Sequence, residues 1–371
     1  MTDLIEVRTA LTATTNNNVW SGTIGGGAEI NKVLDKMIVD NINRGVDLRP
    51  LVDRKPLDQL SFHWLIRTDL GSSSKTAFYG DGATGTPEPT TRVPLIATSL
   101  SIRSDYEVTG LMAAGSRSFF DAFADEAKDA IDDLKLGEEK TMICGTDTGA
   151  YGLGNGYNGL LQLMRWNSTN GGDTEGTAAK KMADTTALYS VTRAAGTTYL
   201  DTSYVIAGTA GTATGVLELK HLDEAKDRSD KKGAKAHERV YFCSVERGSE
   251  INRLLQPQQR FAGTLELEGG FSVSTYKNVP IVTSRFMDKN GATNVSSWDS
   301  STDADNSMYL LDLNNIEFRV LDGVDAKHIP IMGNDTSIRK DVRGGYFKTY
   351  GIFIMKRFNT QVHIANLTAP A

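Results

Sequence analysis

The sequence predicts an α+β fold that is rich in loops, and three observations indicate it. One long stretch repeats apolar residues at helical spacing, whereas most other apolar segments are short and strand-like. The chain holds 36 glycines but only 9 prolines, which indicates many turns without low-complexity linkers. A strand, a turn and a helix follow one another between residues 240 and 255, which is typical of an α/β layer.

The size and charge of the chain limit its class. With 371 residues and a mass of 40.3 kDa, it is longer than one hydrophobic core usually supports, so we expect one elaborated domain or two domains that share an interface. The net charge of −6 argues against a dedicated surface for DNA or RNA. Cys144 and Cys243 lie far apart and neither belongs to a CxxC motif, which argues against a disulfide framework or a zinc site.

The sequence shows no targeting signal. The N-terminal residues lack a basic segment followed by an apolar one, and no run of about 18 apolar residues occurs. We therefore expect a protein that is made and kept in water, in a reducing cytoplasm.

About the first 58 residues predict an extended arm. They contain a polar stretch at residues 14–18, four glycines between residues 22 and 27, and one short amphipathic helix at residues 28–43. Such an arm has one apolar face and needs a surface to lie against. The apolar positions of its helix are Ile30, Val33, Leu34, Met37, Ile38 and Ile42.

Two strand-like segments, Ser61 to Leu70 and Val93 to Val108, flank a stretch rich in Gly, Ser, Thr and Pro. They predict a long two-stranded β-ribbon. An isolated ribbon is only marginally stable in water because it cannot bury a face by itself. We therefore expect it to rest on another molecule or on another part of this chain.

The strongest helix signal runs from Ser118, which can cap it, to about Lys140. At 1.5 Å per residue this helix is roughly 35 Å long, although Gly137 weakens its last turns. Most of its acids lie opposite its apolar stripe. The stripe consists of Phe119, Phe120, Phe123, Ala127, Ala130, Ile131 and Leu134.

The rest of the chain predicts alternating helices and strands. A helix is predicted at residues 216–228, and a buried strand at residues 240–244 precedes a helix at residues 249–255. The polar residues 288–306 predict an exposed loop. Further strands are predicted at residues 271–275, 280–284, 308–313, 346–355 and 360–364.

The chain contains short matches to cofactor-site and catalytic motifs, but the residues around each match lack what such a site needs. Gly154, Gly156 and Gly159 match GxGxxG, but a glycine-rich turn precedes them where a nucleotide site needs a strand, so we interpret them as a turn. The SxxK match that ends at Lys75 lies in the predicted loop without a buried base, and the five histidines show no metal-ligand spacing. We expect no cofactor and no metal.

The acids Glu138, Glu139, Asp303 and Asp305 are the candidates for catalytic carboxylates. Adjacent acids usually form a solvated surface, and no arrangement that would activate a nucleophile is visible. The residues therefore favour a protein that is not an enzyme.

Two segments carry opposite charge. Residues 118–140 hold eight acids and three lysines, a net charge of −5, whereas residues 337–365 hold six bases and one acid, a net charge of +5. Chance can divide surface charge in this way. The alternative is that the two segments meet, within one subunit or between neighbours, where complementary charge fixes register more than it adds affinity.

The order of these elements, over nearly the whole chain, resembles that of the major capsid proteins of tailed phages with the Hong Kong 97-like fold. The arm, the ribbon, the long helix, a glycine-rich turn, the α/β layer and the returning strands follow one another as in that family. The most similar stretch, Ser118 to Leu160, includes Ile143-Cys144-Gly145-Thr146-Asp147-Thr148-Gly149 and Asn158-Gly159-Leu160. Three others are similar, Arg239 to Leu255, Val273 to Met287 and Tyr346 to Leu367.

The resemblance implies a function and a domain organisation. The chain would be a structural protein that self-assembles into the icosahedral shell around the double-stranded DNA of a tailed virus. It would be synthesised in the host cytoplasm and act in the virion capsid. The implied parts are an N-terminal arm at 1–58, the ribbon or E-loop at 59–110, a peripheral domain with the spine helix at 111–149 and 331–371, and an α/β axial domain at 150–330.

The implied partners are copies of the chain itself, as pentamers and hexamers, together with a portal and a decoration protein. Because only about 58 residues precede the ribbon, a separate scaffolding protein, or none, is also implied. We expect only weak contact with packaged DNA, without sequence preference, and no contact with a membrane.

Some members of the resembled family join their subunits by a Lys–Asn isopeptide bond, for which Lys75 and Asn359 are the candidates here. Such a bond needs a nearby buried acid that deprotonates the lysine, and the sequence does not place one. The apolar contact candidates could equally be ordinary core residues. The predicted subunit contacts are Ile30, Val33, Met37, Phe62, Trp64, Ile66, Lys75, Arg92, Asp129, Asp133, Arg339, Lys340, Arg343, Lys356 and Arg357.

Two alternative functions stay open at this point. Encapsulin compartments, which enclose enzymes, are built from the same fold. A carbohydrate-active or other soluble enzyme, with an unrecognised carboxylate site, is the alternative from a different class.

Overall fold

The computed structural model describes most of the chain, and these residues pack as two compact units. The first unit contains residues 102–136 and 326–349, and the second contains residues 46–101, 137–325 and 350–371. The predicted helix at 28–43 and the predicted loop at 288–306 lie outside the described residues. These are 45–69, 81, 90–116, 121–145, 157–164, 187–192, 198–208, 215–234, 238–256, 264–267, 271–287, 307–331 and 342–368.

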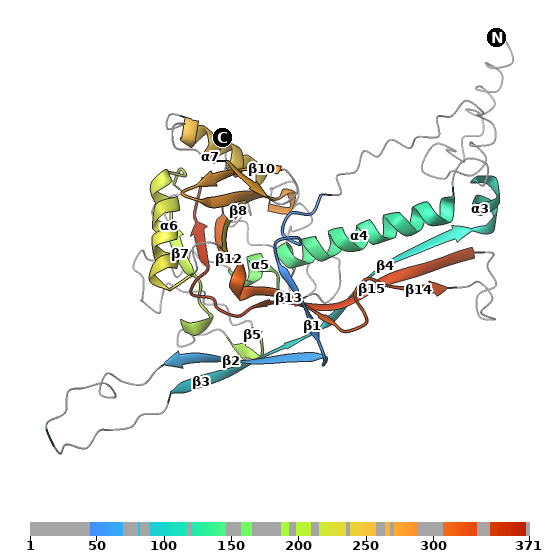
Figure 1. Cartoon of the computed structure of the whole chain (residues 1–371), viewed down its shortest axis with the longest axis horizontal. Coiled ribbons are helices and arrows are strands. Elements are labelled where there is room, and N and C mark those ends of the chain that lie inside the picture. Colours follow the sequence, from blue (N-terminus) through green and yellow to red (C-terminus); the bar gives the residue numbers. More distant parts are fainter. Residues whose placement is uncertain are drawn as a thin grey trace, which may run out of the picture. The chain divides into compact units, whose positions relative to one another are not determined.

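A seven-stranded sheet lies at the centre of the second unit (Figure 1). Its central strands β8, β12 and β16 are buried along their whole length, as expected for strands that are covered on both faces. The predicted strands at 240–244, 271–275, 280–284 and 308–313 are confirmed. The strand order is β7 (Ser203–Ile206), β16 (Val362–Ala365), β12 (Met308–Asp312), β8 (Arg239–Cys243), β11 (Val279–Thr283), β10 (Phe271–Tyr276) and β9 (Thr264–Leu267).

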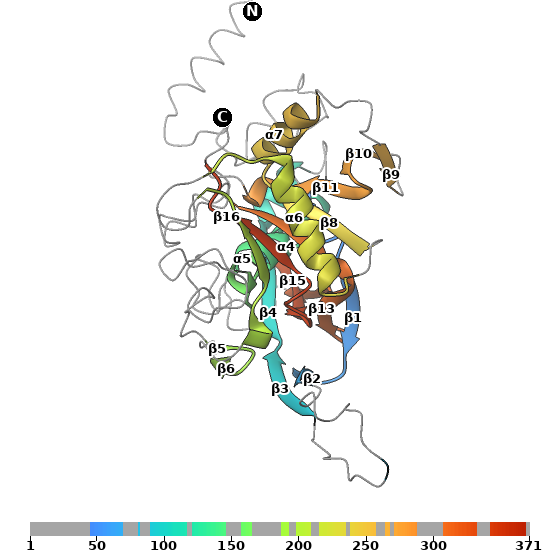
Figure 2. The same cartoon turned by 90° about the vertical axis from the view of Figure 1, so that its left-hand side faces the viewer.

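Neighbouring residues of a strand in this sheet point to opposite faces, and a hydrophobic core lies on each face. Tyr241 shares one core with α6 (Leu219–Lys231) and α7 (Val245–Leu255), whereas Phe242 belongs to the core on the other face. Figure 2 shows α6 lying across the sheet. Both helices were predicted, but α7 begins at Val245 rather than at Ser249. The reason is a cap, since the Ser244 hydroxyl accepts the Arg247 N–H at 3.2 Å.

A second sheet in this unit contains β1 (Asp53–Leu57), β13 (Ile316–Leu321) and the C-terminal part of β15 (Val342–Met355). We expected residues 53–57 in the arm, because about the first 58 residues show little hydrophobic periodicity. That expectation is wrong. β1 runs parallel to β13, and Leu48, Val52 and Leu57 are buried in the core.

The ribbon consists of β2 (Ser61–Asp69) and β3 (Thr91–Thr98), an antiparallel pair in which Trp64 lies opposite Leu95. The predicted second strand, Val93 to Val108, is in fact two strands. β3 stays with β2, whereas β4 (Leu100–Thr109) pairs with β15. Hydrophobic periodicity cannot reveal such a change of partner, because both strands alternate in the same way.

The first unit is a sheet on which a helix packs. It contains most of β4, the N-terminal part of β15, β14 (Lys327–Ile331), α3 (Gly110–Ser116) and most of α4 (Ala122–Cys144). Tyr106 and Phe347 from the sheet share a core with Ala130 and Leu134 from α4. We expected both C-terminal strands in this unit. Only β15 contributes to it, since β16 pairs with β7 and β12 of the seven-stranded sheet.

The long helix α4 confirms the strongest signal of the sequence, with shifted ends. Its 23 residues make it about 35 Å long. The residue before it is Asp121, whose Oδ1 accepts the N–H groups of Phe123 at 3.1 Å and Ala124 at 3.3 Å. The predicted cap, Ser118, lies outside the described residues. The helix continues through Gly137 and past Lys140 to Cys144.

Two glycines pack the end of α4 against α5 (Leu160–Leu163). The Gly159 N–H donates to the Gly145 carbonyl at 2.8 Å. A Cβ on Gly159 would lie 2.6 Å from the Gly145 nitrogen and 2.7 Å from the Thr141 carbonyl oxygen, which is closer than real side chains come. The glycine is therefore needed for close backbone packing, whereas Gly154 and Gly156 of the GxGxxG match lie outside the described residues.

The substitution Gly159→Ala tests this packing. We expect it to lower the free energy of unfolding by about 2 kcal/mol or more, because backbone atoms cannot move away from the new Cβ as a side chain could. Thermal unfolding of the purified protein measures the change. The matched control is Gly115→Ala in α3, where a Cβ meets nothing within 4 Å, and which should leave stability unchanged or slightly raised. Equal melting temperatures of the two variants would contradict the account.

Candidate functional site

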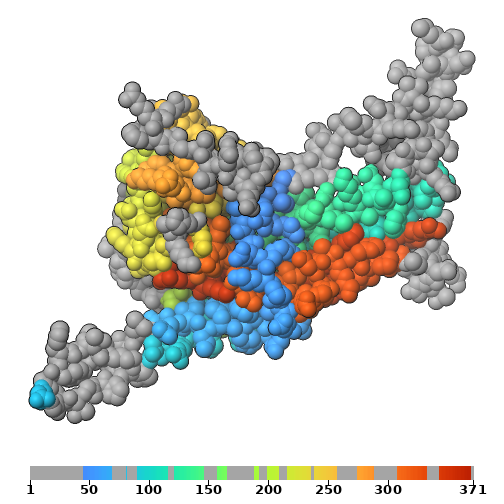
Figure 3. Space-filling view, viewed as in Figure 1, coloured from blue at the N-terminus to red at the C-terminus, as the bar shows by residue number. Residues whose placement is uncertain are grey.

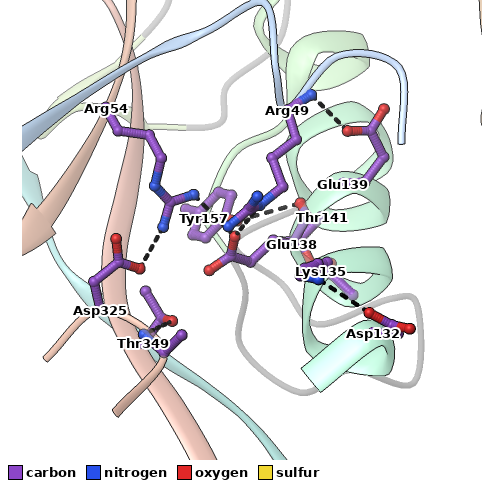
Figure 4. A network of polar contacts seen from close by, with 12 residues as sticks. Arg49, Arg54, Asp132, Lys135, Glu138, Glu139, Thr141, Tyr157, Asp325 and Thr349 are labelled. Carbon is purple, nitrogen blue, oxygen red and sulfur yellow. Dashed lines mark hydrogen bonds and ion pairs between the residues drawn. The ribbon is translucent and has the colours of Figure 1, made fainter. Parts of the chain in front are cut away.

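The last turns of α4 carry two adjacent acids, Glu138 and Glu139, whose exposed fractions are 1% and 0%. Their burial corrects our expectation of a solvated acidic surface. Consecutive helix residues project about 100° apart, so the two carboxylates reach different partners (Figure 4). Buried carboxylates are costly unless they are paired and hydrogen-bonded, which makes their partners structurally important.

Glu138 binds two arginine side chains. Its Oε2 accepts Arg49 Nε at 2.8 Å and Arg54 Nη1 at 3.0 Å. Arg54 also donates from Nη2 to Asp325 Oδ1 at 2.6 Å, and its guanidinium lies 4.8 Å from the centroid of the Phe318 ring. This network joins the end of α4 to the residues around the start of β1 and to the loop after β13.

Glu139 binds backbone instead of side chains. Its Oε1 accepts the N–H groups of Asp47 at 3.1 Å and Leu48 at 2.6 Å, and its Oε2 accepts the Arg49 N–H at 2.6 Å. Burial raises the pKa of Glu139, and these three N–H groups oppose the rise. The helix thereby fixes the path of residues 47–49. Residues 46–69 continue from there as a band on the face shown in Figure 3, in blue.

One face of the ribbon rests on the chain's own core. Phe62, Trp64 and Ile66 are partly buried against it. The Trp64 ring meets Tyr189 edge-on with centroids 4.9 Å apart, and the Ile96 N–H donates to the Tyr189 carbonyl at 3.2 Å. Tyr189 lies in the turn between β5 (Ala187–Leu188) and β6 (Val191–Thr192), so this small hairpin supports the ribbon.

A cluster of charges lies beneath Phe62. The Arg319 guanidinium is 3.9 Å from the centroid of the Phe62 ring and binds Glu317 at 3.0 Å. Glu317 also binds Lys55 at 2.5 Å and Lys356 at 2.6 Å. Burial alone would raise the pKa of Glu317, but the hydrogen bonds from Lys356 and Lys55 lower it below its usual value. One buried carboxylate thus joins β1, β13 and the end of β15 at the base of the ribbon.

The other face of the ribbon points away from this core. Leu65 and the neighbouring Leu60 are 64% and 65% exposed. Arg67 lies directly opposite Arg92, and like charges in this position destabilise a two-stranded pair. Among the described residues, neither arginine forms an ion pair. This face is apolar at its centre and positive at one end.

Within the part of the chain that the structure describes, no helix is long and apolar enough to cross a membrane. The described His, Cys, Asp and Glu side chains form no group of three or more that could hold a metal ion. Cys144 and Cys243 are free thiols, both buried, and burial raises the pKa of Cys144 to about 12.

A model of the SU10 major capsid protein family matches residues 24–346, which is most of the chain. The chain belongs to this family. It is a major capsid protein, a structural component of the virion capsid and not an enzyme. Comparison with curated proteins finds no match.

Solved structures share the fold at low sequence identity. The capsid of Cyanophage A-1(L) is 13% identical with a TM-score of 0.60, and the alignment covers 92% of this chain and 99% of that one. The capsid of an empty GTA particle is 13% identical with a TM-score of 0.60, over 95% and 99%. The SrpI encapsulin of Synechococcus elongatus PCC 7942 is 11% identical with a TM-score of 0.56, over 91% and 94%.

These likenesses show the Hong Kong 97-like capsid fold and no more. Because an encapsulin shares it, the fold alone does not distinguish a phage shell from an encapsulin compartment. The family match makes that distinction.

The structure of this capsid protein describes only some of the predicted contact residues. Phe62, Trp64 and Ile66 face the chain's own core, which is the alternative we left open for them, whereas Arg92 lies on the outward face of the ribbon. Asp129 and Arg343 are exposed. Their part in subunit contacts stays a prediction. Ile30, Val33, Met37, Lys75, Arg339 and Lys340 lie outside the described residues.

The predicted acidic and basic segments have partners elsewhere in the chain. Asp133 accepts the Ser104 hydroxyl at 3.0 Å. Lys356 binds Glu317, and Arg357 donates to the Asn359 side chain at 3.0 Å and to the Lys232 carbonyl. In the first unit, α4 and β15 contact each other through apolar side chains and not through the predicted charges. A meeting of these segments between neighbouring subunits stays a prediction.

Sequence reasoning missed the two arginines that bind Glu138, and it misjudged the acids themselves. One signal was present. Glu138 follows Ala130 and Leu134 at steps of four residues, so it continues the apolar stripe of the helix rather than its solvated face. An acid in such a position indicates a buried carboxylate with a cationic partner. Nothing local in the sequence identifies Arg49 and Arg54 as that partner.

The substitution Glu138→Ala tests the carboxylate network. We expect it to lower the free energy of unfolding by about 2–3 kcal/mol, since it leaves two partly buried guanidinium groups without their shared acceptor. Chemical denaturation of unassembled protein measures this loss. Asp129→Ala, which removes an exposed acid of the same helix, is the control and should change stability by less than about 1 kcal/mol. Similar losses in the two variants would contradict the role of burial.

Proposed function

We propose that this capsid protein assembles as pentamers and hexamers around double-stranded DNA, and that the outward face of the ribbon contacts a neighbouring subunit. The observation that supports this contact is the exposed pairing of Leu65 with Pro94 beside the paired Arg67 and Arg92. An exposed apolar patch on a strand face is typical of a surface that another molecule covers.

The proposal includes a division of the chain into the parts of the Hong Kong 97-like fold. The ribbon is the E-loop, and α4 is the spine helix. The compact unit to which residues 102–136 and 326–349 both belong supports a discontinuous peripheral domain. The seven-stranded sheet with α6 and α7 supports an axial domain centred on residues 150–330. The arm then ends before β1, near residue 45.

The proposal includes further subunit contacts and partners. The apolar arm positions Ile30, Val33 and Met37 lie against a neighbour, and the acids Asp129 and Asp133 meet bases from residues 339–357 of another copy. A scaffolding protein, a portal and a decoration protein are further partners. Packaged DNA makes only weak contacts, because the net charge of −6 gives no excess of cations for phosphates.

A shell held together by such contacts is stable even when each contact between two subunits is weak. Each subunit in a closed shell repeats the same modest contact with several neighbours, and the second and later contacts form at a high effective concentration. One weakened contact per subunit is therefore multiplied over the whole shell.

The substitution Leu65→Asp tests the proposed contact. We expect it to prevent shells under conditions in which the wild type forms them, because it buries a charge in every copy of the contact. Its melting temperature as an unassembled subunit should stay within about 2 °C of the wild type, since Leu65 is exposed there. Size-exclusion light scattering and negative-stain electron microscopy detect the shells.

Trp64→Ala is the matched variant on the other ribbon face. It should lower the free energy of unfolding of the unassembled subunit by about 2 kcal/mol, because it removes the ring that packs on Tyr189. Normal shells from Leu65→Asp would contradict the proposed contact. A wild-type protein that stays a monomer or dimer in every assembly condition would contradict the proposed function itself.

A further inference from the structure

Two histidine side chains are buried on the two sides of the seven-stranded sheet in the second unit. His221 lies in the first turn of α6, on the side that α6 and α7 cover, and is 5% exposed. His363 lies in β16, on the side of the sheet that contains Tyr309, and is 2% exposed. A buried imidazole is stable only in its neutral form unless an acid pairs with it. The response of each ring to acid therefore depends on the groups around it.

The ring of His221 is held by a hydrogen bond that only its neutral form can accept. Its Nδ1 accepts the Glu218 N–H at 3.1 Å, and the His221 N–H donates to the Glu218 carbonyl at 3.0 Å. The side chain thus satisfies a backbone N–H at the start of α6, where the helix itself offers no acceptor. A proton on Nδ1 would remove this acceptor and place a positive charge at the positive end of the helix dipole.

The charged groups around His221 do not offset the cost of protonation. Burial lowers the pKa of His221, Lys220 adds to the decrease, and Glu218 and Glu224 oppose it. The strands β7 and β16, which pack against α6, contribute apolar side chains to the core on this side. Other titratable or charged groups on this side include Asp223 of α6, Tyr241, Cys243, Tyr276 and Lys277 from the sheet and its turns, and Arg247 of α7.

The ring of His363 lies among neutral groups. It stacks on the Tyr309 ring with centroids 4.6 Å apart, and its Nε2 forms a hydrogen bond with the Ser307 hydroxyl at 2.9 Å. The titratable groups near it are Tyr309 on β12, Tyr204 directly opposite on β7, and Cys144 next to Tyr309. No carboxylate of the described residues pairs with it. Burial lowers the pKa of His363 to about 3, and the backbone of Met164 opposes the decrease.

We propose that His221 and His363 make the second unit sensitive to acid, since each ring has to stay neutral while α6, β7 and β16 are packed together. Opening of this region returns both rings to water, where the ordinary His pKa is 6.5. Because both folded-state pKa values are lowered, the open state binds protons that the folded state does not. The stabilisation is therefore complete above pH 6.5 and is lost as the pH falls below that value.

Urea unfolding of the unassembled subunit at pH 7.5 and pH 5 tests the proposal. A histidine that takes up no proton in the folded state lowers the folding equilibrium constant by about 30-fold over this range. His363→Gln should remove about tenfold or more of the fall seen in the wild type. His221→Asn, which keeps an acceptor for the Glu218 N–H, should remove a smaller part. Each variant is compared with itself at the two pH values, so a general loss of stability cancels.

The control is His63→Gln in the ribbon. His63 is exposed, so water surrounds its ring before and after unfolding, and this variant should keep the wild-type pH dependence. An unchanged pH dependence in both His363→Gln and His221→Asn would overturn the proposal. Neither outcome depends on shell formation, so the proposed function is tested separately.

A second measurement serves if the variants do not fold. Nuclear magnetic resonance of the wild-type subunit, with labelled histidine rings, follows the protonation of all five histidines. We expect fewer than five rings to titrate between pH 7.5 and pH 5, because the ring of His363 stays neutral throughout this range. Titration of all five rings in the folded subunit would contradict the proposal.

Discussion

The arrangement of the second unit depends on two buried carboxylates that leave neighbouring positions of one helix in different directions. Glu138 holds side chains and Glu139 holds backbone, and both act on residues 47–54. A charge buried at the end of a helix is unfavourable unless it is paired and hydrogen-bonded, so both carboxylates depend on their contacts with residues 47–54. They place the chain just before β1, and β1 leads directly into β2 of the ribbon.

The position of the ribbon follows from this arrangement. Once β1 lies parallel to β13, Lys55 reaches Glu317, and Glu317 holds Arg319 beneath Phe62. Trp64 and Tyr189 complete the support on the same side. One ribbon face thus contributes to folding of the subunit, and the other face is the one that we propose to contact a neighbouring subunit. Strict alternation of strand side chains produces this division, because residues 62, 64 and 66 face the core while residues 63, 65 and 67 do not.

The sequence predicted those elements whose signal is local. α4, β8 and β12 have a strong helical stripe or a continuous apolar run, and each lies where it was expected. The order of such elements was enough to identify the capsid family by resemblance. β1 was missed because its polar residues are stabilised by partners more than 250 residues away, as in the Lys55–Glu317 pair. The burial of Glu138 and Glu139 was missed because the groups that bind them lie 84 to 92 positions away in the sequence, although Glu138 continues the apolar stripe of α4.

The central claim is that the two faces of the ribbon serve different purposes, and hydroxyl-radical footprinting of unassembled subunits and of shells tests it most directly. Each residue is compared with itself in the two states. The account predicts that oxidation of Leu65 falls strongly on assembly, whereas oxidation of Trp64, already packed on Tyr189 within the subunit, changes little. Equal oxidation of Leu65 in both states would show that the outward face stays open in the shell, which contradicts the account.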